Sequence, residues 1–314
     1  MKYVPVLAFI LLAAGCSWLS PERTVPHEGR YGIYALVPKT GAVELLYSSD
    51  HMLGGLHLNS AGDRFAFSSR ITGDSLEDEE ICTVASDGSD LRRLTDNSFL
   101  DTYPCWSPDG SRIAFLSWRD STLDIYVMNA DGTGQDLLYD SGFHDADISW
   151  VGDVIAFTRE SRIWRMRSDG TDPARITDPP RAGEWGNAPL PFGDYDPRLN
   201  PAADRIVFER LVDDASPHGN YDLFLINLDG TGETRLTTTG YTQGMASWSA
   251  AGDRVVYVVS AVGTDGRYDL YQMNADGTDN KNITPDYFPE GFLCNHPVFS
   301  PNGAAVYFIG EWWE

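Results

Sequence analysis

The strongest constraint on the fold is a sequence block that returns along the chain. It reads W-S-P-D-G-S-R-I-A-F at residues 106–115 and continues as D-I-Y-V-M-N-A-D-G-T-G at residues 124–134. An aromatic residue ends the second strand of each copy, at steps of 48, 42, 51, 49 and 51 residues: Phe67, Phe115, Phe157, Phe208, Tyr257 and Phe308. A repeat of this length with strand-forming residues predicts a β-propeller.

Turn residues divide each copy into four short strands. The first turn is Ser107–Gly110 in the clearest copy, where proline and glycine favour a turn. The second turn carries Asp-Gly, the dipeptide that type I′ hairpins prefer. Its five copies are Asp87-Gly88, Asp131-Gly132, Asp169-Gly170, Asp229-Gly230 and Asp276-Gly277. We therefore expect four antiparallel strands per blade and a structural role for these aspartates.

The two ends of the repeat region complement each other. The first half of the unit occurs six times, but only five of these copies are followed by a second half. Residues 33–47 match residues 125–139 without a gap and supply the missing half. The sequence thus predicts an all-β, six-bladed propeller over residues 31–314, with its last blade closed by the N-terminal hairpin. Such closure removes open sheet edges.

The first thirty residues have the pattern of an export signal. Lys2 precedes an apolar run at residues 4–12, which is too short to span a membrane as a permanent helix. Ala13-Ala14-Gly15-Cys16 resembles a bacterial lipobox, although Ala13 stands where leucine is usual. We expect a signal peptide at residues 1–15, lipidation of Cys16 and a tether over residues 16–30; a plain secretory signal is the alternative. Ser17 implies, by the same resemblance, sorting to the outer membrane.

Charge and cysteine content limit the partners. A formal net charge of −23 repels nucleic acid and anionic lipid, so we expect no nucleic-acid partner and membrane contact through the lipid anchor alone. The charge serves either solubility, including in saline surroundings, or the recruitment of cations or a basic partner. We expect a monomer. Cys82, Cys105 and Cys294 are expected to be small buried residues without a bridge or a metal.

The sequence contains no familiar catalytic signature. The G-x-S-x-G elbow, the H-E-x-x-H zinc motif and the phosphate-binding loop are all absent. We therefore predict no catalytic residue and a role other than that of an enzyme.

A candidate binding site arises where the copies of the repeat stop agreeing. Just before the bulky residue of the innermost strand, the six copies carry Gly55, Tyr103, Asp147, Asp196, Met245 and His296. A structural position would repeat one residue type. We predict that Tyr103, Asp147, Asp196 and His296 converge on the channel and bind a divalent cation, or a cationic or sugar-like ligand. The alternative is a water-filled channel; no other cofactor is expected.

A second candidate is the longest insertion, residues 178–195, which contains Trp185 and four prolines. A loop of this composition is either packed on itself or serves as a lid on which a partner docks. Trp185 is our candidate binding residue there.

The motif W-S-P-D-G-x-x-I-A-F followed by D-I-Y-x-M-N-x-D-G-T resembles the TolB-type, WD-like propeller repeat over about residues 31–314. TolB proteins are periplasmic, contact the peptidoglycan-associated lipoprotein and carry an α/β domain before the propeller. Here a lipobox stands in that place. The resemblance implies a TolB-like lipoprotein on the periplasmic side of a bacterial envelope.

The leading hypothesis is a non-enzymatic envelope protein that binds a protein or glycan through one propeller face. One alternative is a metal-dependent polysaccharide lyase similar to oligogalacturonide lyases, in which channel histidines hold the metal. His296, with His57 and His144, would have to serve here. The other alternative is a sensing module of a larger envelope complex.

Overall fold

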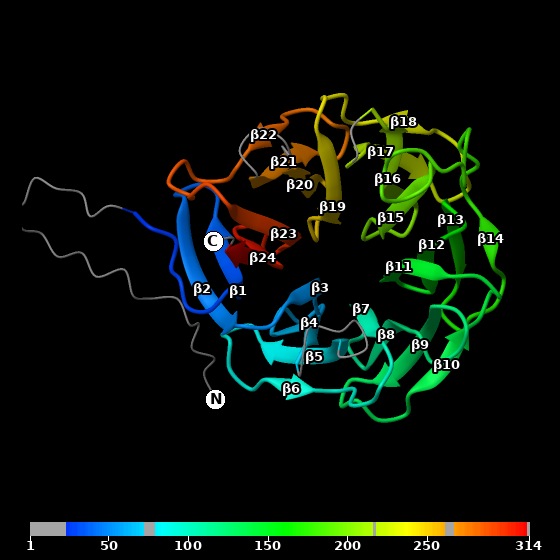
Figure 1. Cartoon of the computed structure of the whole chain (residues 1–314), viewed down its shortest axis with the longest axis horizontal. Coiled ribbons are helices and arrows are strands. Elements are labelled where there is room, and N and C mark those ends of the chain that lie inside the picture. The colour runs from blue at the N-terminus through cyan, green and yellow to red at the C-terminus, as the bar shows by residue number, and fades with distance from the viewer. Residues whose placement is uncertain (1–22, 72–78, 216–217, 261–266, 313–314) are drawn as a thin grey trace, which may run out of the picture.

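The computed structural model describes residues 23–71, 79–215, 218–260 and 267–312. Cys16 and the predicted signal peptide lie outside these residues. The described chain is all-β and forms a propeller whose sheets are arranged in a ring (Figure 1). We call the space along the axis of this ring, where residues of all six innermost strands line a cavity, the central channel. No helix within it is long and apolar enough to cross a membrane.

Strands occupy four positions from the channel to the rim. Strands nearest the channel are β3 (Leu53–Leu58), β7 (Asp101–Trp106), β11 (Asp145–Val151), β15 (Asp194–Leu199), β19 (Thr242–Trp248) and β23 (Phe292–Phe299). Their neighbours are β4 (Arg64–Arg70), β8 (Arg112–Ser117), β12 (Val154–Arg159), β16 (Arg205–Asp213), β20 (Arg254–Ser260) and β24 (Val306–Trp312). Third strands are β5 (Glu79–Ala85), β9 (Asp124–Asn129), β13 (Arg162–Arg167), β17 (Asn220–Asn227), β21 (Tyr268–Asn274) and β1 (Tyr31–Val37). Rim strands are β6 (Arg92–Arg93), β10 (Asp136–Tyr139), β14 (Ala174–Arg175), β18 (Thr234–Arg235), β22 (Lys281–Asn282) and β2 (Ala42–Ser49).

Hydrogen bonding groups these strands into four four-stranded sheets and one eight-stranded sheet. The four-stranded sheets are β3–β6, β7–β10, β11–β14 and β15–β18. The eight-stranded sheet contains β19–β22 and the set β23-β24-β1-β2, and one parallel residue pair, Tyr268 with Leu293, joins the two sets.

The N-terminal hairpin pairs with the C-terminal strands, as predicted. β1 lies antiparallel to β24 from Tyr31 opposite Glu311 to Leu36 opposite Val306, and β2 pairs with the other edge of β1. Ile33, Tyr34 and Leu36 of the hairpin are fully buried. Segments from the two ends of the chain therefore share one hydrophobic core.

The aromatic residues that set the repeat register form the core between sheets. All six, from Phe67 to Phe308, are 0–1% exposed. Apolar side chains of neighbouring sheets interleave around them, so burial of the repeat position explains its strict spacing. Cys82, Cys105 and Cys294 are buried free thiols, which confirms their prediction as small core residues.

The Asp-Gly turns differ from the predicted type I′ form. A type I′ turn needs positive φ at both central residues, but at Asp131-Gly132 only the glycine has positive φ, at 88°. Asn129 and Thr133 close a three-residue loop through the Thr133 carbonyl and the Asn129 N–H, at 2.8 Å. Asp131 accepts the Thr133 N–H at 3.0 Å. The preference of this aspartate for a local side-chain bond selects the longer loop.

Residues 23–30, expected to belong to a tether, are packed against the β1–β2 hairpin and its surroundings. Val25 is 5% exposed and joins the core around Phe288. Arg23 donates to the Thr40 carbonyl at 2.9 Å, and the His27 and Trp312 rings lie 4.2 Å apart. The segment is thus held along the rim of this sheet (Figure 1).

Each innermost strand runs from one face of the propeller to the other. We call the face with the turns after these strands the turn face; its turns are residues 59–63, 107–111, 152–153, 200–204, 249–253 and 300–305. We call the opposite face, where connections enter these strands, the loop face; it includes residues 94–100, 140–144, 176–193, 236–241 and 283–291.

Candidate binding site in the channel

All six innermost strands share one irregularity. Each shows a register shift against its neighbour at the same repeat position. The residue there is left-handed in every case, with φ between 48° and 61°: Gly55, Tyr103, Asp147, Asp196, Met245 and His296. Five of these are not glycine, and each pays about 1–2 kcal/mol for this backbone. The bulge is therefore a built feature that directs one residue per strand to the channel.

These six residues, which we call the bulge ring, lie at equivalent positions of the six innermost strands, and several of them are in contact. The Tyr103 and His296 rings lie 6.0 Å apart in a T-shaped arrangement. Gly55 lies beside them, and a Cβ atom there would come within 3.0 Å of the Tyr103 Cα atom. Glycine is thus required for the close approach of β3 and β7.

Carboxylates on the other side of the ring bind backbone amides of the next sheet. Asp147 Oδ2 accepts the Asp196 N–H at 3.2 Å. Glu209 Oε1, from β16, accepts the Met245 N–H at 2.6 Å. Each carboxylate therefore satisfies an amide that the bulge turns away from its own sheet.

Arg198 supplies the positive charge of the channel. Its Nη2 atom lies 2.6 Å from Asp196 Oδ1, and its Nη1 atom donates to the Ile148 carbonyl at 3.3 Å. A positive charge beside Asp196 is therefore already supplied by the chain itself, and binding of a divalent cation in the channel stays a prediction. Among the described residues, no group of three His, Cys, Asp or Glu side chains could hold a metal ion.

Burial affects the protonation of two carboxyls near Arg198, those of Asp196 and Glu209. It raises the pKa of Asp196 to about 6, against the opposing effect of Arg198. Burial and the nearby Asp196 raise the pKa of Glu209 well above its usual range. Burial therefore disfavours the ionised form of both carboxyls, and each carboxylate raises the pKa of the other.

The channel histidines are neutral hydrogen-bonding groups. Burial, and secondarily Arg198, lowers the pKa of His57 and of His296 to about 4. His57 Nδ1 accepts the Trp106 N–H at 3.2 Å, while Nε2 lies 3.7 Å from Cys105 Sγ. Nδ1 is therefore an acceptor, and the proton of this imidazole is on Nε2.

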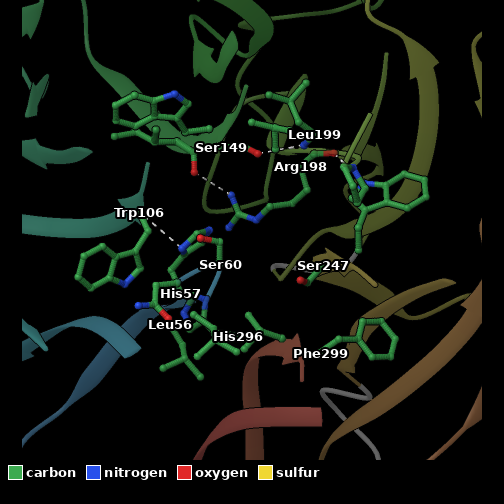
Figure 2. A pocket seen from close by; sticks show the side chains of 18 of the residues that line it. Leu56, His57, Ser60, Trp106, Ser149, Arg198, Leu199, Ser247, His296 and Phe299 are labelled. Carbon is green, nitrogen blue, oxygen red and sulfur yellow. Dashed lines mark hydrogen bonds between the residues drawn. The ribbon is translucent and has the colours of Figure 1, made fainter. Parts of the chain in front are cut away.

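A cavity of about 360 Å³ extends from the bulge ring toward the turn face (Figure 2). Its lining includes Gly55 and His296 at one end and the turn residues Ser60 and Pro301 at the other. Neutral polar groups and a single guanidinium thus line it together with apolar walls. This mixture suits a ligand that offers both apolar surface and hydrogen-bonding groups.

The innermost strands contribute a second set of divergent residues, two positions after the bulge ring: His57, Cys105, Ser149, Arg198, Ser247 and Val298. The sequence indicated only His57 of this set as a channel residue, in the lyase alternative, although the same alignment of repeats displays the variety of all six positions. Glu209 was also missed; it follows the core Phe208, at a position where other copies carry Ser68, Leu116 or Thr158. A carboxyl among such small or apolar residues is the signal that could have identified it.

Trp185 lies apart from the cavity, in the β14–β15 connection on the loop face. Its side chain is 73% exposed. The loop packs on itself: Gly183 N–H bonds the Phe192 carbonyl at 2.8 Å, and Arg181 lies 3.5 Å over the Phe192 ring. The contacts agree with a loop packed on itself, while docking of a partner on the exposed Trp185 stays a prediction.

Comparison with known proteins agrees with this architecture. No family model matches the chain. An uncharacterized protein of Agrobacterium fabrum is 31% identical over 191 residues, which are 57% of this chain and 61% of that protein. A TolB homolog of Chlorobium luteolum is 27% identical over 162 residues, and a Tol-Pal system protein TolB of Desulfosudis oleivorans is 30% identical over 120. These matches cover 50% and 36% of this chain, and only 33% and 26% of those relatives.

Solved structures match over most of the chain. A protein of Agrobacterium tumefaciens provisionally assigned as TolB superposes with a TM-score of 0.70 at 15% identity, covering 92% of this chain and all of that one. TolB of Acinetobacter baumannii gives 0.56 at 15% identity, covering 90% of this chain and 64% of its own. The fold and its central channel define a β-propeller protein. With its TolB relatives in sequence and structure, the chain is a TolB-like β-propeller protein.

Proposed function

We propose that this protein is a non-enzymatic lipoprotein of the bacterial envelope, which binds a partner protein through the channel cavity on its turn face. The observation that carries the proposal is the cavity itself. The six copies of the repeat share their core and turn positions but differ in residue type at positions that line it, including His57, Ser247 and His296. Variation there is expected of a binding surface and not of a scaffold. The Tol-Pal system names of the relatives favour an envelope protein over a glycan as partner.

We further propose that the propeller has six blades. The eight-stranded sheet then counts as two blades, β19–β22 and β23-β24-β1-β2, which among the described residues share a single ladder pair, Tyr268–Leu293. Each half has the four antiparallel strands of the other sheets.

The side chains that could hold a metal ion in the channel favour a binding function over lyase chemistry. A lyase of Vibrio parahaemolyticus acting on oligogalacturonate shares the fold, with a TM-score of 0.51 at 12% identity. In this chain the bulge-ring carboxylate of Asp196 is engaged by Arg198 at 2.6 Å. A metal would have to compete with that guanidinium for its ligand.

A cavity-filling substitution tests the proposed site. Ser247 faces the cavity (Figure 2), so Ser247→Trp is expected to block entry and to reduce capture of the envelope partner at least tenfold. Leu137→Trp, on the exposed rim strand β10, is the matched control and should capture as the wild type does. The amount of partner protein recovered with each variant after cross-linking in cells is quantified by mass spectrometry. Equal recovery by Ser247→Trp and the wild type, with unchanged melting temperature, would refute the site.

Lipid anchoring at Cys16 places this cavity in the envelope. Cys16→Ala is expected to shift the protein from the membrane fraction to the soluble envelope fraction, or to block signal processing, because stable anchoring takes more than one acyl chain. Metabolic labelling with a fatty-acid probe checks the modification. Label retained by the Cys16→Ala protein contradicts it.

A further inference from the structure

Asp145, at the start of β11, lacks an ion pair that its counterpart has. Asp194 begins β15 at the same repeat position, and its carboxylate makes two bonds to Arg210, at 2.5 and 2.9 Å. Asp145 is equally buried, at 0% exposure. Its Oδ1 atom receives a bond from Ser141 Oγ at 3.0 Å, and its Oδ2 atom has no hydrogen-bond partner.

The arginine that could pair with Asp145 is present but engaged elsewhere. Arg159 lies directly across from Asp145 on β12, as Arg210 lies across from Asp194. Its guanidinium instead lies over the Phe143 ring at 4.8 Å and the Trp164 ring at 4.6 Å, and its Nε atom lies 3.6 Å from Glu160 Oε2. These aromatic contacts belong to the loop face, where Phe143 is 45% exposed.

Charged groups from three elements face Asp145. Asp140 belongs to the loop before β11, Asp124 begins β9, and Arg159 ends β12. Burial is the main cause that raises the pKa of Asp145, to about 7, and the two acidic neighbours act in the same direction. Ser141 and Arg159 oppose the increase.

Two more titratable side chains complete this environment. The Tyr139 hydroxyl accepts a bond from Arg159 Nη1 at 3.4 Å. His144 precedes Asp145; its Nδ1 accepts the Leu123 N–H at 3.0 Å, and its ring contacts Trp118 at 5.0 Å. Tyr139 ends β10, and His144 lies in the connection that carries Phe143, so both side chains border the loop surface next to Asp145.

We propose that Asp145 and Arg159 form a pH-sensitive switch on the loop face. When Asp145 is protonated, Arg159 stays on Phe143 and Trp164. When Asp145 is ionised, the guanidinium moves across the strands into the pair that Asp194 and Arg210 already show, and Phe143 loses its cation–π partner. This switch is independent of the proposed binding function, because it acts on the face opposite the cavity.

Fluorine NMR tests the switch directly. With 4-fluorophenylalanine at position 143, the ¹⁹F resonance should shift between pH 5 and pH 9 with a midpoint near 7. The shift should be absent in Asp145→Asn and present in the control Asp140→Asn, which changes an acidic neighbour on the same loop. A resonance that does not move in the otherwise unaltered protein, or that moves with the same midpoint in Asp145→Asn, would overturn the proposal.

Thermal stability gives a second readout with a defined sign. The carboxyl of an unfolded chain titrates near pH 4, whereas that of folded Asp145 titrates near 7. The folded state thus binds the extra proton between these values, and stability from this group falls as pH rises through that window. Asp145→Asn should raise the melting temperature relative to wild type at pH 8.5 but not at pH 5. An equal difference at both pH values contradicts the switch.

Discussion

Deletion of residues 31–49 is expected to abolish the monomeric fold. The β1–β2 hairpin supplies the strand that pairs with β24, together with the fully buried side chains of Ile33, Tyr34 and Leu36. Burial of each contributes about 1.5–3 kcal/mol. Their sum is comparable with the whole stability of a domain, which is about 5–15 kcal/mol.

The deletion also leaves β24 as an unpaired edge, so the residual protein should aggregate. Size-exclusion chromatography and thermal unfolding measure both effects. Lys39→Ala, at the exposed tip of the same hairpin, is the control and should leave both unchanged. A truncated protein that stays monomeric with an unaltered melting temperature would contradict the closure.

Arg198→Met is expected to destabilise the protein by about 3 kcal/mol at pH 8. Removal of one partner leaves an uncompensated buried charge on Asp196, which typically costs 3–5 kcal/mol. We expect the lower end of this range of destabilisation because the Arg198 side chain is 23% exposed, and solvent screens the charge in part. Arg175→Met, which removes a rim arginine 47% exposed, should cost less than 1 kcal/mol.

The sign of the pH dependence is specific to this pair. The pKa of Asp196 is already raised to about 6 with the guanidinium in place, and without it the carboxyl protonates more readily. The cost of Arg198→Met should therefore shrink as pH falls from 8 to 5. Asp196→Asn should rescue much of the loss at pH 8. Chemical denaturation at the two pH values provides the free energies of unfolding, and a cost independent of pH would refute the electrostatic account.

Repetition is what made the fold predictable. The spacing from Phe67 to Phe308 identified the core, and the match between residues 33–47 and 125–139 identified the strands that meet across the termini. The bulge ring was predictable for the same reason, since one aligned position changed its residue type in each copy. The Asp-Gly dipeptide alone predicted the wrong turn type. In the structure Asp131 Oδ1 accepts the Thr133 N–H, and this side-chain hydrogen bond favours the longer loop.

Contacts between sheets could not be predicted from the repeat. Arg198 and Glu209 belong to one unit, but their partners include Ile148 and Met245 of the neighbouring units. The alignment of copies places each residue within its own sheet only. It therefore could not indicate that Arg198 pairs with Asp196, nor that the cavity lies toward the turn face, away from Trp185.

Photocross-linking in living cells tests the central claim, that the turn-face cavity binds the partner. A photoreactive phenylalanine analogue is placed in separate variants at Ser60 on the cavity mouth, at Trp185 on the loop face and at Leu137 on the rim. We predict one discrete adduct from Ser60 and none from the other two positions. Adducts from Trp185 alone would contradict the account and place the binding surface on the opposite face.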